Sequence, residues 1–289
     1  MTSLAEGTVS FRDGETWYLV SQPANPAPGR LPLVVLHGGP GMTHDYLRPL
    51  PSLFEDRQVV LYDQFGTGNS SRRPDWDAKE WTPGLFVEQL RGLLAHLGVA
   101  ETGGFHLLGH SWGGMLAQEY VLSHPAGPAS LILSDTTASA AAIMESINPL
   151  RAAISAEEPD EQIQINLFVE RHVCRITPMP DDLARSYELI AENMSVYLAM
   201  MGGLETEVTG TLRDWNAVPR LAEIDVPTLV LAGEHDELGP AAWSPLAELI
   251  PGARAHVFAG ASHVPYLESP DEYQSIVSAF LAEHDSGLE

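Results

Sequence analysis

The chain has 289 residues, of which 44% are hydrophobic, and its 15 Lys plus Arg and 39 Asp plus Glu give a formal net charge of −24. The hydrophobic fraction is typical of a folded globular protein and excludes a disordered chain. The negative charge argues against nucleic acid and anionic membrane surfaces as partners, because their phosphate groups would be repelled.

The sequence carries no marks of export or membrane insertion. Its one cysteine, Cys174, excludes an intramolecular disulfide and fits a reducing compartment. The N-terminus has neither the basic nor the apolar region of a secretory signal, and no apolar run approaches the roughly 20 residues of a membrane span. We therefore expect a cytoplasmic protein.

Short apolar runs alternate with helical patterns in the first half of the chain. Strands are expected over 16–21, 31–36, 58–62, 105–108 and 129–133, and helices over 86–97 and 112–123. This alternation predicts an α/β fold with a mostly parallel central sheet and helices on both faces.

The alternation stops after Ser134 and resumes near Pro227. In between, helices are expected over 160–174 and 181–201, and at the end of the chain strands over 228–233 and 253–258 precede a helix over 271–284. We therefore expect an α/β core (1–138 and 214–289) and an inserted helical cap (139–213) that lies over the carboxyl ends of the strands, where α/β sheets bind ligands. With little sequence between Ser139 and Asp160, the cap is expected to be short.

The segment Gly109-His110-Ser111-Trp112-Gly113 matches the pattern G-x-S-x-G between an expected strand and an expected helix. In this context the serine sits on a sharp turn, which exposes its hydroxyl, and the helix N-terminus favours negative charge nearby. We predict that Ser111 is a nucleophile. The alternative is a glycine-rich turn that only connects the two elements.

A second glycine-rich turn, His37 to Gly41 (HGGPG), follows the strand expected over 31–36. Acyl transfer needs two N–H donors for the developing oxyanion, and the backbone N–H groups of Gly39 and Trp112 are the candidates. Gly38, in the same turn, is a candidate substrate contact. The alternative is a tight turn that binds nothing.

A nucleophilic serine needs a base and an acid that orients the base. Asp236 and His263 each follow an expected strand and complete the chain order Ser, Asp, His. His110 is the main competing base, but we expect its side chain to point away from Ser111 and to pack in the interior, and His235 is too close to the acid. Since no metal-ligand spacing or nucleotide-binding motif is present, we expect neither metal nor cofactor.

Four motifs in order resemble one family over nearly the whole chain. They are HGGPG at 37–41, MTHDYL at 42–47, YDQFGTGNS at 62–70 and GHSWGG at 109–114. Together they resemble the α/β-hydrolase superfamily and, more narrowly, its proline iminopeptidase family, which also contains amino-acid amidases. The resemblance implies a serine hydrolase that releases an N-terminal proline or small apolar residue from a peptide, or hydrolyses an amino-acid amide, through an acyl-enzyme.

The resemblance also implies that carboxylates hold the α-amine of the substrate. Glu237 matches one of them because it directly follows Asp236, and Glu205 matches the carboxylate of the cap by its distance to residues 210–215. An ammonium group that leaves water needs such anions. Glu207 is the alternative ligand, and a solvated acidic face of the cap is the alternative reading of both glutamates in the cap.

The segment Arg171 to Arg175 (RHVCR) is similar to a cap segment of the amidases; we expect it to be structural, with a pocket-lining Arg or His as the alternative. The chain departs from the family in its short cap, in Met201-Gly202-Gly203 and in His110. A short cap would open the site to bulkier or non-peptide substrates.

Two other functions fit the sequence. An esterase, lactonase or pathway-specific acyl hydrolase would use the same triad and would accept substrates without a free amine. A non-catalytic binding protein on the same fold would leave Ser111 unlabelled by a serine-directed probe.

Overall fold

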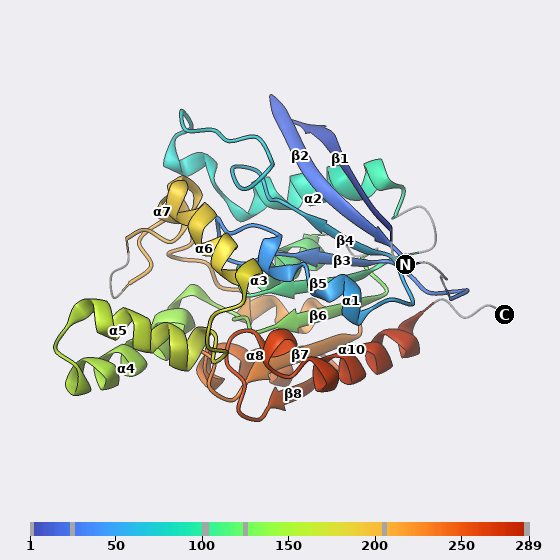
Figure 1. The fold of residues 1–289 in the computed structure, drawn as a ribbon. Coiled ribbons are helices and arrows are strands. Elements are labelled where there is room, and N and C mark those ends of the chain that lie inside the picture. Colours follow the sequence, from blue (N-terminus) through green and yellow to red (C-terminus); the bar gives the residue numbers. More distant parts are fainter. Residues whose placement is uncertain (1–2, 24–26, 100–103, 124–126, 204–206, 286–289) are drawn as a thin grey trace.

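A computed structural model describes residues 3–23, 27–99, 104–123, 127–203 and 207–285. Its centre is an eight-stranded sheet in the order β1-β2-β4-β3-β5-β6-β7-β8 (Figure 1). The strands are β1 Ser3–Phe11, β2 Gly14–Gln22, β3 Leu33–Leu36, β4 Val59–Tyr62, β5 His106–His110, β6 Ser130–Ser134, β7 Thr228–Gly233 and β8 Arg254–Phe258. In the order of the sheet, every pair of neighbouring strands from β4 through β3 to β8 is parallel, whereas β2 pairs antiparallel with both β1 and β4. The predicted mostly parallel sheet is thus confirmed.

Helices cover both faces of this sheet. They are α1 Leu50–Leu53, α2 Pro83–Leu97, α3 Trp112–Ser123, α8 Pro240–Leu249, α9 Pro265–Glu268 and α10 Pro270–His284. Alternate strand residues belong to two separate apolar clusters, one with side chains of α2, α3 and α8 and the other with side chains of α1, α9 and α10. Because both faces are covered, the central parallel strands are continuous apolar runs such as Leu33–Leu36.

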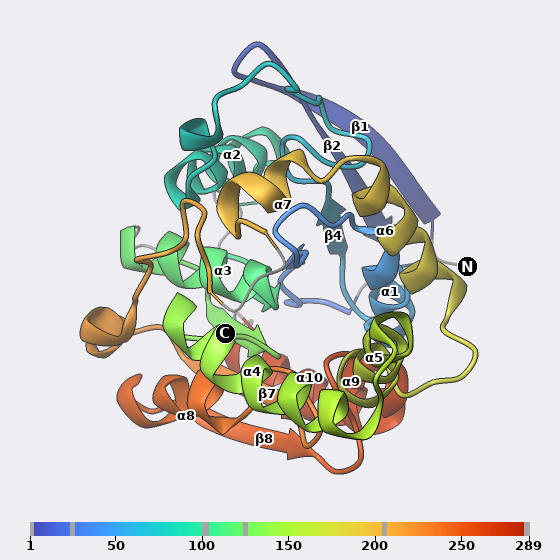
Figure 2. The ribbon, with the colours of Figure 1, turned by 90° about the vertical axis from the view of Figure 1, so that its left-hand side faces the viewer.

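The chain between β6 and β7 forms a group of helices, which we call the cap. Its elements are α4 Ala140–Glu157, α5 Glu161–Phe168, a π-helical turn Val169–Val173, α6 Asp181–Glu192 and α7 Ser195–Met200. They lie together on the side of the molecule opposite both termini in Figure 1 and face the viewer in Figure 2. No helix within the described ranges has the length and apolar character to cross a membrane.

The cap differs from the sequence expectation in three places. The stretch before Asp160, expected to hold little, forms the 18-residue helix α4, whose first turn is capped by the side chain of Ser139. The helix expected over 160–174 changes to a π-helical turn at Val169. The helix expected over 181–201 is interrupted at Asn193, whose side-chain amide donates to the carbonyl oxygen of Gly66 in the core at 2.9 Å.

Candidate active site

Ser111 lies on the turn between β5 and α3, with a backbone φ of 56° that side chains rarely adopt. Flanking glycines make this turn possible. A Cβ atom on Gly109 would lie 2.3 Å from the carbonyl oxygen of Gly113, and one on Gly113 would lie 2.2 Å from that of Leu36. The N–H of Ser111 donates to the carbonyl oxygen of Ser134 on the next strand at 3.0 Å, so the turn is fixed to the sheet.

Asp236 and His263 meet at the ends of β7 and β8. The Nδ1–H of His263 donates to Oδ1 of Asp236 at 2.7 Å, and the same oxygen accepts from the N–H of Leu238 at 2.9 Å. Both side chains are almost fully buried. Because Nδ1 carries this hydrogen bond, Nε2 is the nitrogen that remains for proton transfer. It lies 3.8 Å from Oε1 of Glu237.

One cavity of about 580 Å³ connects these loops with the cap. From the core it is lined by Ser111, His263 and Glu237, and by Gly39 and Trp112. The cap contributes mainly apolar side chains from its helices, among them Ile143, Ile147, Ile154, Phe168, Tyr187 and Tyr197. The helix α4, over a stretch where no helix bounds were predicted, contributes Ile143, Ile147, Arg151 and Ile154 to this lining.

The charges around His263 favour its protonated form. Burial alone would lower the pKa of His263, but the carboxylates of Asp236 and then Glu237 outweigh it and raise this pKa to about 10. Burial raises the pKa of Glu237, which is opposed by the charge of His263. In the free protein the two groups therefore stabilise each other's charged forms.

The glycine turn at 37–41 is held by its neighbours. The N–H of Gly38 donates to the hydroxyl of Tyr46 at 2.7 Å, and a Cβ on Gly38 would lie 2.9 Å from that of Ser111. Gly38 is not among the residues that line the cavity, whereas Gly39 is. The N–H of Trp112, at the first position of α3, has no acceptor within that helix.

Two of the motifs singled out in the sequence bond to each other beneath the site. The backbone N–H of Gln64 donates to Nε2 of His37 at 2.9 Å, so the Nδ1–H of His37 donates to the carbonyl oxygen of Gly38. Burial lowers the pKa of His37 to about 4, which keeps the ring neutral. The side-chain oxygen of Gln64 accepts from the indole N–H of Trp112 at 2.8 Å. This chain of bonds connects the glycine turn to the start of α3.

His110 is buried, as expected, but it does more than pack. Its Nε2–H donates to the carbonyl oxygen of His263 at 2.7 Å, and its Nδ1 accepts from the hydroxyl of Tyr46 at 2.9 Å. Burial lowers the pKa of His110 to about 3, so the ring is neutral and fits this donor–acceptor pattern. The pair His110 and Tyr46 therefore joins the glycine turn to the loop of His263, a role that sequence reasoning missed.

The cap segment 171–175 also contacts the catalytic loops. The carbonyl oxygen of His172 accepts from the N–H of Glu237 at 3.1 Å, and the ring of His172 donates to the carbonyl oxygen of His235 at 2.9 Å. Neither Arg171 nor His172 lines the cavity, and Cys174 is a buried free thiol. These contacts are those of the structural role expected for this segment.

The predicted cap carboxylates take no described part in the site. Glu205 lies outside the described residues, and Glu207 is exposed and absent from the cavity wall. Within the part of the chain that the structure describes, no three His, Cys, Asp or Glu side chains are grouped as metal ligands would be.

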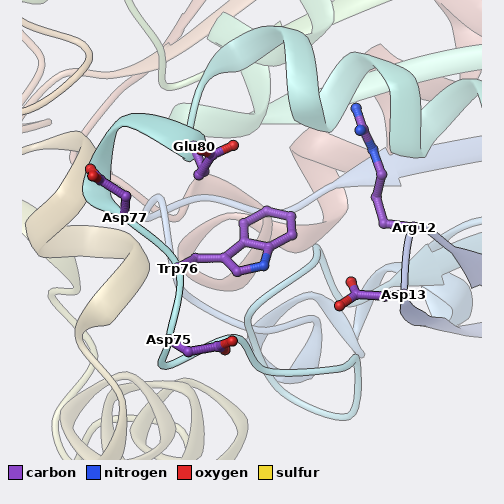
Figure 3. Close-up of a pocket in the computed structure, with 6 residues that line it drawn as sticks. All are labelled: Arg12, Asp13, Asp75, Trp76, Asp77 and Glu80. Carbon is purple, nitrogen blue, oxygen red and sulfur yellow. The ribbon is translucent and has the colours of Figure 1, made fainter.

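A separate hollow lies on the surface beside the β1–β2 turn. Figure 3 shows its lining: Arg12, Asp13, Asp75, Trp76, Asp77 and Glu80. It contains none of the predicted site residues, so the cavity under the cap is the candidate active site.

The chain is similar in sequence and in structure to known α/β hydrolases. Residues 32–270 match the family model of the α/β hydrolase fold. The chain is 33% identical to a proline iminopeptidase of Lactobacillus delbrueckii subsp. lactis, over 93% of this chain and 96% of the relative. Its structure is similar to the crystal structure of a proline iminopeptidase from Mycobacterium smegmatis (TM-score 0.92, 41% identity, 97% and 99% of the two chains). It is also similar to the crystal structure of VinJ (TM-score 0.88, 38% identity, 97% and 99%).

Proposed function

Because the chain belongs to the α/β-hydrolase superfamily and, within it, to the proline iminopeptidase family, we propose that it releases an N-terminal proline or small apolar residue from a peptide or an amino-acid amide. The observation that carries this proposal is the 2.7 Å bond between His263 and Asp236 at the wall of a cavity that Ser111 shares. This arrangement supports acyl transfer by a serine nucleophile.

In the proposed reaction, the hydroxyl of Ser111 attacks the carbonyl carbon of the scissile amide and Nε2 of His263 takes its proton. Asp236 orients the ring of His263 and stabilises the imidazolium. The backbone N–H groups of Gly39 and Trp112 donate to the oxyanion of the tetrahedral intermediate. His263 then protonates the leaving amine, and water hydrolyses the acyl-enzyme by the same steps.

Glu237 is the proposed partner of the substrate ammonium. Its carboxylate lies at the cavity wall, next to the proposed base, and its side chain is 22% exposed. A cation bound there would have its charge paired, which a buried ammonium needs. Glu205 remains a proposed second partner. The apolar side chains of the cap support an apolar residue next to the scissile bond over a charged one.

The test is the Ser111→Ala variant. We expect turnover of an alanyl or prolyl p-nitroanilide to fall by roughly 10³- to 10⁶-fold, because the nucleophile is lost while binding remains. A fluorophosphonate probe should label the wild type at Ser111 and leave the variant unlabelled. Ser262→Ala is the matched control, since Ser262 precedes the proposed base but bonds to Glu268. Turnover by the folded Ser111→Ala protein at the wild-type rate would exclude this mechanism.

A further inference from the structure

A second buried carboxyl group lies behind the proposed catalytic acid. Asp135 directly follows β6, has a positive φ of 52° and is completely buried. Its N–H donates to the carbonyl oxygen of Leu231 at 2.8 Å, and its Oδ1 accepts from the N–H of Gly233 at 3.0 Å. The side chain of Asp135 therefore reaches across to the end of β7, the strand after which Asp236 follows.

Asp236 has one oxygen that lacks a donor. Its Oδ1 accepts both from His263 and from the N–H of Leu238, whereas its Oδ2 is buried and has no hydrogen-bond partner among the described residues. The carboxyl of Asp135 is hydrogen-bonded to Gly233, three residues before Asp236, and the charge of Asp236 acts on it. A buried carboxylate oxygen without a donor is unfavourable, so the neighbouring carboxyl is the group to supply one.

The surroundings of Asp135 favour its neutral form. The groups that act on it are Asp236, His263, the hydroxyl of Ser134 and the phenols of Tyr46, Tyr266 and Tyr273. His263, when protonated, is the one cation in this set, and it already bonds to Asp236. Burial, and then the charge of Asp236, raise the pKa of Asp135 well above its ordinary value. Two adjacent buried carboxyl groups carry one negative charge between them far more readily than they carry two.

We propose that Asp135 is a positioning residue whose protonated carboxyl donates its O–H to Oδ2 of Asp236 and thereby fixes the plane of the carboxylate that orients His263. The inference rests on the role of Asp236 in the proposed function. Asp135 does not line the cavity, so it acts through Asp236 and makes no contact with substrate. Oδ1 of Asp236 is then held by His263 and Leu238, and Oδ2 by Asp135.

Two variants test this assignment. Asp135→Asn keeps an N–H donor for Oδ2 of Asp236, and Asn tolerates a positive φ. We expect it to keep kcat within about fivefold of wild type and to leave the acid limb of the kcat/KM profile at the same pH. Asp135→Ala removes the donor, and we expect kcat to fall by about 5- to 150-fold, the range that corresponds to an unpaired buried acceptor, with KM unchanged.

Asp63→Asn is the matched control for a buried aspartate that follows a strand. Oδ1 of Asp63 accepts from the N–H of His44 and its Oδ2 accepts from that of Asn69, so an amide would place donors against donors. We expect Asp63→Asn to lower the melting temperature markedly and Asp135→Asn to leave it near the wild-type value. In infrared difference spectra between wild type and Asp135→Asn, the carbonyl band of a protonated carboxylic acid should be present at neutral pH.

Three results would overturn the proposal: a loss of kcat in Asp135→Asn as large as in Asp135→Ala, a shift of the acid limb to lower pH in Asp135→Asn, or the absence of the infrared band. The second would mean that Asp135 is ionised and raises the pKa of His263 by its charge. Failure of the proposed function itself would appear separately, as a wild-type protein without turnover or without a probe label on Ser111.

Discussion

Replacing Glu237 with Gln should shift the preference of the protein from free-amine substrates toward esters without an amine. The variant keeps the size of the side chain and removes its charge, which lies 3.8 Å from Nε2 of His263. At about 4 Å, two unit charges interact by about 1 kcal/mol in water and by about 4 kcal/mol at the effective dielectric constant of about 20 near a protein surface. Glu237 is partly exposed, so we expect its interaction energy with His263 to lie between these values, which corresponds to a change of about 1–3 units in the pKa of His263.

The sign follows from the role proposed for His263, which accepts a proton only when it is neutral. Asp236 and Glu237 raise its pKa to about 10 in the free protein, so Glu237→Gln lowers this pKa and moves the acid limb of kcat/KM to lower pH. For an ester without an amine, such as p-nitrophenyl acetate, the rate on the acid limb should rise by about 10- to 1,000-fold. A free-amine substrate shares this gain, because kcat/KM for either substrate starts from the same free protein, but its ammonium also loses its charge partner. The ratio of its kcat/KM to that of the ester should therefore fall by roughly 30- to 5,000-fold, the equivalent of about 2–5 kcal/mol.

The assay is the pH profile of kcat/KM for p-nitrophenyl acetate and for alanyl p-nitroanilide, with Glu234→Gln as control. Glu234 precedes Asp236 in the same loop but is 55% exposed and bonds to the N–H of Gly260, so its variant should keep both profiles. Equal losses on both substrates in Glu237→Gln would show that Glu237 has only a structural role and does not pair with a substrate ammonium. An acid limb at the wild-type pH would show that the charge of Glu237 does not act on His263.

Two further predictions concern the stability of the fold. In Gly113→Ala the new Cβ would lie 2.2 Å from the carbonyl oxygen of Leu36, so we expect the free energy of unfolding to fall by at least about 1–3 kcal/mol and the activity to be lost. In Gly92→Ala, on helix α2, the new Cβ would meet nothing within 4 Å, so the free energy of unfolding should rise by about 0.5–1 kcal/mol. Thermal unfolding measures both changes. Burial alone would raise the pKa of the Asp285 carboxyl, but donors led by Arg57 outweigh it and hold that pKa below its ordinary value. The carboxylate therefore stabilises the fold at neutral pH and less as the pH falls through its folded-state pKa. Asp285→Ala leaves the buried Arg57 without this partner, and it should lower the free energy of unfolding in urea by about 3–5 kcal/mol at neutral pH and by less in acid. An equal loss at both pH values would show that the charge of Asp285 does not stabilise the fold.

The central strands and their helices could be predicted because their burial gives the local sequence a recognisable pattern of apolar residues. Runs such as Leu33–Leu36 are apolar at every position because both faces of the sheet are covered. The helix α3 begins and ends at the residues predicted, since Gly109 and Gly113 fix the turn before it. The four family motifs are also continuous segments of the sequence, so they and the fold class that they indicate could be recognised without the structure.

Elements that depend on distant contacts were not predictable in the same way. The strand Ser3–Phe11 is mostly exposed and polar, and it forms by pairing with β2 at the edge of the sheet. The helix Ala140–Glu157 contains Pro149 in its interior, which argues locally against a helix. The break at Asn193 reflects a bond to the core carbonyl of Gly66, which no local pattern reveals.

Within the candidate site, sequence order predicted residues with reactive groups at the ends of their side chains, and it did not predict the buried residues that bond to these loops. Ser111, Asp236 and His263 follow strands in the order of a known triad, and that order is visible in the chain. His110 and Asp135 acquire their roles only when neighbouring strands are aligned. His110 reaches the carbonyl of His263, 153 residues later, and Asp135 reaches the N–H of Gly233, 98 residues later.

The proposed function requires that this serine hydrolase recognise a free α-amine beside the scissile amide. The most direct test is kcat/KM for prolyl and alanyl p-nitroanilides, each with a free and an acetylated amine. We predict a preference for the free amine by roughly 30-fold or more, the lower end of the range for a buried charge pair, in both series. Equal rates on free and acetylated substrates would contradict the claim and assign the triad to an esterase or acyl hydrolase that does not recognise an ammonium group.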